Sequence, residues 1–141
     1  MASVPTDRPL RLLHIDDDAI NMMVLDQLLT SMGHHPTGVA SANEALDLLQ
    51  NETFDAVLSD VHMPDIDGVK LQQRLADLVP ELPVFAVTAD VMTRTQQDFE
   101  ALGFAGVLAK PLDLSKLREL LSLLHRSPAS RPFFAFGIAK G

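Results

Sequence analysis

Five polar residues each stand directly after a short apolar run of the chain. They are Asp16, Asp17, Asp60, Thr88 and Lys110. If these runs are strands of one parallel sheet, all five residues lie at the edge where open α/β sheets bind their ligands. Three carboxylates held close together repel one another, so they either raise a pKa or recruit a cation. Oxygen ligands of this kind suit a hard divalent ion, and Mg²⁺ accepts a partly hydrated site with one or two carboxylates.

The lysine and the threonine add anion binding to this group. Beside a metal ion, the ammonium of Lys110 and the hydroxyl of Thr88 would cradle an anion with several oxygens, for which phosphoryl is the natural candidate. No catalytic triad built on a serine, cysteine or histidine accompanies them, so the residue best placed to be the nucleophile is a carboxylate. We predict Asp60 for this role, because it stands alone at its strand end and precedes a turn containing Pro64 and Gly68.

The elements that must position these residues alternate along the chain. Five apolar runs of strand length are separated by stretches in which apolar residues recur at helical spacing. The strand-length runs are Leu10 to Ile15, Val39 to Ala40, Ala56 to Ser59, Val84 to Val87 and Val107 to Ala109. This alternation predicts a parallel sheet that is covered by helices on both faces.

Residues at the expected helix ends support the same boundaries. Ser41 with Glu44 is typical of a capping box, and Asp18 and Asp113 are suited to cap the helices that follow them. Gly33 is expected to end the first helix.

The histidines are expected to be structural. His14 interrupts an apolar strand, and we interpret it as a hydrogen-bonded residue of the core or the sheet edge rather than a ligand. His34 and His35 stand at a helix end before Pro36, which predicts turn residues.

The composition excludes several classes of protein. The 141 residues, 47% of them apolar, suffice for one domain with a packed core. A net charge of -8 argues against direct binding of nucleic acid or anionic lipid. The absence of cysteine excludes disulfides, thiolate zinc sites and cysteine catalysis. Since no apolar run approaches about 18 residues, we expect a cytoplasmic protein that is neither secreted nor membrane-spanning.

Four segments, in their order and spacing, resemble the receiver domain of two-component response regulators, including receivers of hybrid histidine kinases. They are LHIDDDAIN, FDAVLSDVHMPDIDG, VTA and LAKPL. The resemblance runs from about Leu10 to Leu124 and implies a flavodoxin-like (βα)₅ sandwich with a five-stranded parallel sheet of order 2-1-3-4-5. We therefore divide the chain into an N-terminal extension of residues 1–9, a receiver domain of residues 10–126 and a C-terminal tail or linker of residues 127–141.

The resemblance implies that Asp60 is the phosphoacceptor, taking a phosphoryl group from the phosphohistidine of a histidine kinase or a histidine phosphotransfer protein. It further implies that Mg²⁺ is bound by Asp17, Asp60 and the backbone carbonyl of His62, while Asp16 assists through water. The output would pass to a downstream protein partner or to an attached output domain. The protein would then be a signalling phosphoacceptor that promotes its own phosphorylation and dephosphorylation rather than an enzyme.

The phosphoryl oxygens would contact the residues that follow the fourth and fifth strands. By the resemblance, Thr88, Ala89 and Lys110 form this phosphoryl-binding and switch group. His62 and Asp90 stand two places after the phosphoacceptor and the threonine, where they are expected to set the lifetime of the phosphoryl group.

One position departs from the family pattern. Receivers commonly carry Tyr or Phe three residues before the lysine, where this chain has Val107. A small β-branched side chain cannot report the switch by the same rotation. Either the signal travels through Thr88 and the loop after the fourth strand into the fourth helix, or the output is weak.

Two other functions compete with the switch. A phosphatase of the haloacid dehalogenase type also uses a strand-end Asp with Mg²⁺, Thr or Ser and Lys. That class usually has a second acid two residues after its nucleophile, and this chain has His62 there. A pseudo-receiver that only binds partners is the other rival, and the complete set of acids, Thr88 and Lys110 argues against it.

The tail differs in character from the rest of the chain. A Ser/Pro segment leads into an apolar cluster made of Phe133, Phe134, Phe136 and Ile138. These residues either dock on the domain or on a neighbouring molecule, since exposed aromatic clusters favour association, or they are the remnant of a linker.

Overall fold

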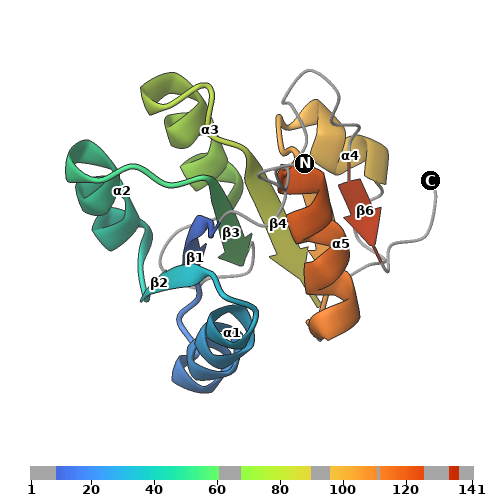
Figure 1. The fold of residues 1–141 in the computed structure, drawn as a ribbon. Helices are drawn as coiled ribbons and strands as arrows, with labels where there is room; N and C mark the ends of the chain where they lie inside the picture. Colours follow the sequence, from blue (N-terminus) through green and yellow to red (C-terminus); the bar gives the residue numbers. More distant parts are fainter. Residues whose placement is uncertain (1–8, 61–67, 90–95, 111, 126–133, 137–141) are drawn as a thin grey trace, which may run out of the picture.

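The computed structural model describes residues 9–60, 68–89, 96–110, 112–125 and 134–136 (Figure 1). Strands and helices alternate along the described residues, and each of the first five strands is followed by a helix. The strands are β1 (Arg11–Ile15), β2 (His35–Val39), β3 (Ala56–Asp60), β4 (Val84–Thr88), β5 (Gly106–Ala109) and β6 (Phe134–Phe136). The helices are α1 (Ala19–Ser31), α2 (Ala42–Asn51), α3 (Gly68–Leu78), α4 (Gln96–Ala101) and α5 (Leu114–Leu124).

All six strands belong to one parallel sheet of order β2-β1-β3-β4-β5-β6. The predicted order of the first five strands is confirmed. The sheet continues with β6, a strand that the sequence did not predict. Asp60 pairs with Val87 and Thr88 pairs with Ala109, so the strand ends that carry polar residues meet at one edge of the sheet.

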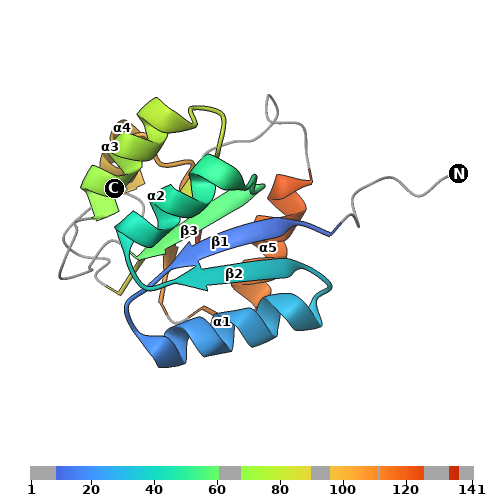
Figure 2. The same ribbon diagram turned by 90° about the vertical axis from the view of Figure 1, so that its left-hand side faces the viewer.

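Helices cover both faces of the sheet, as predicted. Successive strand residues point to opposite faces, and the buried side chains accordingly form two clusters. One cluster includes Leu13 and Val57 with residues of α2, α3 and α4, whereas the other includes Leu12 and Leu58 with residues of α1 and α5. Figure 2 shows α2 and α3 together on the side of the sheet away from α1. Among the described residues, no helix combines the length and the apolar character that a membrane span requires.

The predicted helix caps are present. The carboxylate of Asp18 accepts hydrogen bonds from the main-chain N–H groups of Ile20 and Asn21. Ser41 caps α2 and Asp113 caps α5 in the same way. Each cap satisfies N–H groups that have no partner within the helix, so the starts of these three helices follow from local sequence.

The second strand is longer than predicted. β2 begins at His35, so the expectation that this residue lies in a turn was wrong. The sequence hides the strand because Pro36 and Gly38 disfavour strands. A proline is tolerated here because β2 is an edge strand, and an edge strand has one side on which a main-chain N–H is not needed.

His34, expected in the same turn, is buried. Its Nδ1 accepts a hydrogen bond of 3.0 Å from the main-chain N–H of Leu10. Burial, followed by the charges of His125 and His35, lowers the pKa of His34 from its ordinary value. The neutral imidazole can accept this hydrogen bond at Nδ1, whereas the protonated ring cannot. Neutral His34 therefore links the residue before β2 to the residue before β1.

Candidate functional site

Three carboxylates meet at the carboxyl ends of β1 and β3. Asp16, Asp17 and Asp60 each offer an oxygen atom, and these atoms lie within 4.8 Å of one another. Asp60 is the last residue of β3 and is buried, Asp16 is half-buried and Asp17 is exposed. The cluster is thus open to solvent on the side of Asp17 and enclosed on the side of Asp60.

The turn after β1 is held by main-chain hydrogen bonds. The N–H of Asp16 donates to the carbonyl of Val39 at 3.1 Å, and the N–H of Asp18 donates to Oδ1 of Asp16 at 2.9 Å. Because Asp18 also caps α1, the start of this helix fixes where the two preceding acids lie. Local sequence therefore positions two of the three acids in the cluster.

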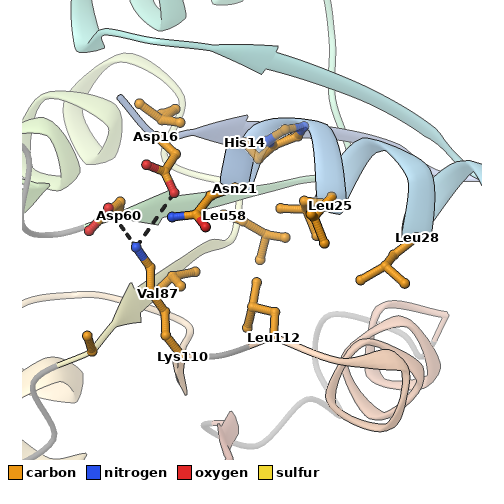
Figure 3. Close-up of a pocket in the computed structure, with 13 residues that line it drawn as sticks. His14, Asp16, Asn21, Leu25, Leu28, Leu58, Asp60, Val87, Lys110 and Leu112 are labelled. Atoms are coloured by element: carbon orange, nitrogen blue, oxygen red, sulfur yellow. Dashed lines mark hydrogen bonds and ion pairs between the residues drawn. The ribbon is translucent and has the colours of Figure 1, made fainter. Parts of the chain in front are cut away.

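Lys110 reaches into this cluster from the end of β5. Its Nζ lies 2.9 Å from Oδ2 of Asp60 and 3.6 Å from Oδ2 of Asp16 (Figure 3). Its main-chain N–H donates to the carbonyl of Thr88 at 2.8 Å, which fixes the strand end from which the side chain extends. Burial would lower the pKa of Lys110, but the hydrogen bond to Asp60 and the charges of Asp60 and Asp16 outweigh it and raise this pKa. The ammonium is therefore held in its charged form.

The donor set fits a hard divalent cation. Three carboxylates give oxygen ligands only, and together they carry more negative charge than the ammonium of Lys110 neutralises. Mg²⁺ prefers such oxygen ligands and keeps several waters, which the exposed side of the cluster allows. Asp16, Asp17 and Asp60 are the described residues that would hold it.

Thr88 and Ala89 lie beside the lysine. Thr88 is the last residue of β4, it is fully buried, and it pairs with Ala109 directly before Lys110. Ala89 lines the same cavity as Asp60 and Lys110. The five groups predicted to converge thus share one edge of the sheet. His62 and Asp90, the predicted lifetime residues, lie outside the described residues, as does the predicted backbone ligand at His62.

Val107 occupies the middle of β5. It pairs with Ala86 of β4 on one side and with Ala135 of β6 on the other, and its side chain is fully buried. Val107 is therefore part of the buried cluster that packs on this face of the sheet.

A cavity of about 440 Å³ adjoins the acidic cluster on the side of α1. Polar side chains gather at one end of it, and apolar side chains from α1, β3 and β4 line the rest (Figure 3). Asn21 lines the same cavity as Asp16 and Lys110 (Figure 3), and sequence reasoning did not single out this residue. Its place in the first turn of α1, close behind the paired acids, is the signal that would have identified it.

His14 confirms the structural interpretation. It is buried, and its Nε2 lies 2.6 Å from Oδ1 of Asp26 in α1. Gly38 stands beside it on β2, where an added Cβ would lie 2.7 Å from Cε1 of the imidazole. The absence of a side chain at Gly38 therefore makes room for the ring.

Comparisons with known proteins agree on one family. A model described as the response regulator receiver domain matches residues 12–122. The sensor histidine kinase RcsC of Escherichia coli (strain K12) is 34% identical over 121 residues, which are 86% of this chain and 13% of that protein. The two-component response regulator ORR24 of Oryza sativa subsp. indica is 39% identical over 113 residues, which are 79% of this chain and 18% of that protein.

A solved structure extends the likeness to the fold. It is the receiver domain of sensor histidine kinase PA1611 from Pseudomonas aeruginosa PAO1, with a magnesium ion coordinated in its active site cleft. It has a TM-score of 0.76 at 25% identity and covers 84% of this chain and 99% of that chain. This chain spans less than a fifth of the length of the two curated relatives.

Proposed function

Since the chain belongs to the response regulator receiver family, we propose that Asp60 is the residue at which it accepts a phosphoryl group. One observation carries this assignment: the buried carboxylate of Asp60 contacts the ammonium of Lys110 inside a cluster of three acids. A nucleophilic carboxylate, a fixed cation and ligands for a divalent ion are then present within one site. These are the groups that phosphoryl transfer requires.

Asp16, Asp17 and Asp60 would hold Mg²⁺, together with the backbone carbonyl of His62. Asp16 would act through a bound water. The magnesium ion in the active site cleft of the PA1611 receiver supports the binding of this ion. When bound, the ion offsets the negative charge of the acids and of the incoming phosphoryl oxygens. Lys110 contributes a second positive charge beside Asp60.

Transfer of the phosphoryl group to Asp60 depends mainly on how the reacting groups are positioned. An oxygen of the Asp60 carboxylate attacks phosphorus, the P–N bond of the donor phosphohistidine breaks, and its electron pair returns to the imidazole ring. The ammonium of Lys110, already 2.9 Å from the acceptor, binds a phosphoryl oxygen as the phosphoryl group moves onto Asp60. Thr88 and Ala89, at the end of β4, would complete the contacts to the phosphoryl oxygens.

The phosphorylated site controls its own lifetime in this account. His62 and Asp90, placed by sequence two residues after Asp60 and Thr88, would control the access of water to the acyl phosphate. Replacing His62 and Asp90 together is expected to change the half-life of the phosphoprotein. An unchanged half-life in that double variant would remove this assignment.

The partners follow from the same chemistry. The donor would be a histidine kinase or a histidine phosphotransfer protein of the cytoplasm, and the receiver of the output would be a downstream protein or an attached output domain. A phosphatase of the haloacid dehalogenase type and a pseudo-receiver are less consistent with the family match and with the complete acid, threonine and lysine set.

Intact-mass analysis tests the phosphoacceptor. The chain is incubated with Mg²⁺ and a small phosphodonor such as acetyl phosphate, beside the variants Asp60→Asn and Asp77→Asn. Asp77 lies exposed on α3 and is the matched control. We expect one added phosphoryl group in the unmodified chain and in the control, and none in Asp60→Asn. Continuous turnover of a phosphate ester would instead favour a phosphatase, and no added mass in any chain would favour a pure binding module.

A further inference from the structure

β2 and β5 differ in how well their outer sides could pair with a further strand. β2, at one edge, contains Pro36, which has no main-chain N–H to offer to a neighbour. β5 contains no proline, and its four residues are apolar or glycine and buried. A strand of this kind at an open edge presents unpaired N–H and C=O groups to any extended chain.

The C-terminal segment of the same chain fills that edge. Phe134, Ala135 and Phe136 form β6, which pairs in parallel with Gly106, Val107 and Leu108 (Figure 1). The order β5, α5, β6 makes another strand–helix–strand unit like the ones before it in the chain. β6 is only three residues long, and very short strands are one way in which natural sheets limit further pairing.

The residues around β6 fit a segment that docks as one short strand. Pro132 stands two positions before β6 and Gly137 follows it directly, and both residue types limit the length of a strand. The apolar composition Phe-Ala-Phe between them is typical of strands. The sequence of this segment therefore has the composition of a strand, and the residue types on either side of it disfavour strands.

We propose that the outer edge of β5, on the side away from β4, is a docking surface for an extended apolar strand, and that β6 of the same chain is its resident occupant. The surface lies along β5, whereas the phosphoacceptor site lies at the end of β5, so the proposal goes beyond the function assigned to Asp60. Removing β6 from the edge makes the main-chain groups of Gly106 to Leu108 available to an extended segment of another polypeptide.

An engineered disulfide tests whether β6 docks within its own chain. The protein has no cysteine, so a single pair introduced at Gly106→Cys and Phe134→Cys has no competitor. These two residues are directly opposed in the register. Gly106→Cys with Ile138→Cys, which lies beyond the end of β6, is the matched control.

After mild oxidation, the opposed pair is expected to form an intrachain disulfide in a yield that does not depend on protein concentration. The control pair is expected to form it at least about ten times more slowly, because its second thiol is out of register. A disulfide-linked dimer whose yield rises with concentration would overturn the proposal in favour of strand exchange between two copies. Equal rates for the two pairs would also contradict it.

Amide hydrogen exchange of the unmodified chain tests the same pairing without cysteine variants, so the test does not depend on whether those variants fold. Amides that join β5 to β6 are expected to exchange at least about tenfold more slowly than in the variant Phe134→Gly/Phe136→Gly. Exchange of all three β6 amides at the rate of a free peptide would overturn the proposal.

Binding of a peptide tests the surface itself. The probe is a labelled synthetic peptide of residues 131–139. It is expected to bind the Phe134→Gly/Phe136→Gly variant at least about tenfold more tightly than the unmodified chain, in which β6 already occupies the edge. Equal affinity for both chains, or binding to neither, would show that the edge of β5 is not a strand-docking surface.

Discussion

β5 serves two regions of the molecule that differ in how they are built. At its end, Lys110 contacts Asp60 through side-chain atoms. Along its side, Gly106, Val107 and Leu108 are paired with β6 through the main chain. The first region needs a lysine and an aspartate at these two positions, because the contact is made by their charged side chains. The second region needs only a short strand, which many apolar sequences could form. A substitution should therefore affect the first region strongly and specifically, and the second weakly and in proportion to strand propensity.

The largest effect is expected in the first region, on the rate of phosphorylation when Lys110 is replaced. Lys110→Ala removes the cation that contacts the acceptor carboxylate, and we expect the rate of phosphorylation by acetyl phosphate to fall by about 100-fold. Quenched-flow sampling followed by intact-mass analysis measures this rate. Lys70→Ala, an exposed lysine of α3, is the control and should leave the rate unchanged. A fall of less than threefold in Lys110→Ala would contradict the role of this ammonium.

The next largest effect is expected on the affinity for Mg²⁺ when Asp17 is replaced. Asp17→Asn removes a charged oxygen ligand from the exposed side of the cluster, so the affinity for Mg²⁺ should fall by roughly tenfold or more. Calorimetric titration measures the affinity, since the chain contains neither Trp nor Tyr. Asp47→Asn, an exposed acid of α2, should bind Mg²⁺ as the unmodified chain does. Unchanged affinity in Asp17→Asn would exclude this residue as a ligand.

A third substitution probes the second region, in the middle of β5. Val107→Phe introduces the aromatic residue common in the family into a side-chain position that is fully buried. We expect the free energy of unfolding to fall by about 1–3 kcal/mol, because the surrounding core must shift to admit the ring. Urea unfolding followed by circular dichroism measures this change, with Val107→Ile as the smaller control. A phenylalanine variant as stable as the unmodified chain would show that space for the ring exists beside β5.

The smallest effect is a dependence of stability on pH, far from both regions. The pKa of His34 is lowered in the folded chain, so the unfolded chain binds the proton more readily. The contribution of His34 is therefore fully present above its ordinary pKa of 6.5 and is lost as the pH falls below that value. We expect the free energy of unfolding of His34→Asn, whose amide oxygen can accept from Leu10 without titrating, to decline less on acidification. Equal declines in both chains would contradict this assignment.

The two regions also differ in how far the sequence predicts them. The acids, Thr88 and Lys110 were identifiable because each follows an apolar run, and parallel strands bring such positions to one edge. β6 was not predicted as a strand, because three residues carry no measurable periodicity and main-chain pairing needs no particular side chain. β2 was underestimated for a related reason, since Pro36 is tolerated only because the strand lies at an edge of the sheet.

The apolar pattern of α1 shows the same limit. Ile20, Met23 and Val24 follow helical spacing, yet they are exposed, and Leu25 and Leu29 are buried instead. A helix that is apolar on several sides does not reveal from sequence which side faces the sheet. Position in the sheet and the facing side of a helix are properties of the assembled fold, whereas caps and strand-end residues are local.

Chemical trapping of the phosphorylated residue tests the central claim most directly. Borohydride reduces an aspartyl phosphate to homoserine, so the chain is phosphorylated with Mg²⁺ and acetyl phosphate, reduced, digested and sequenced by tandem mass spectrometry. The account predicts homoserine at position 60 and at no other aspartate. Homoserine at position 16 or 17 with an intact Asp60 would contradict it.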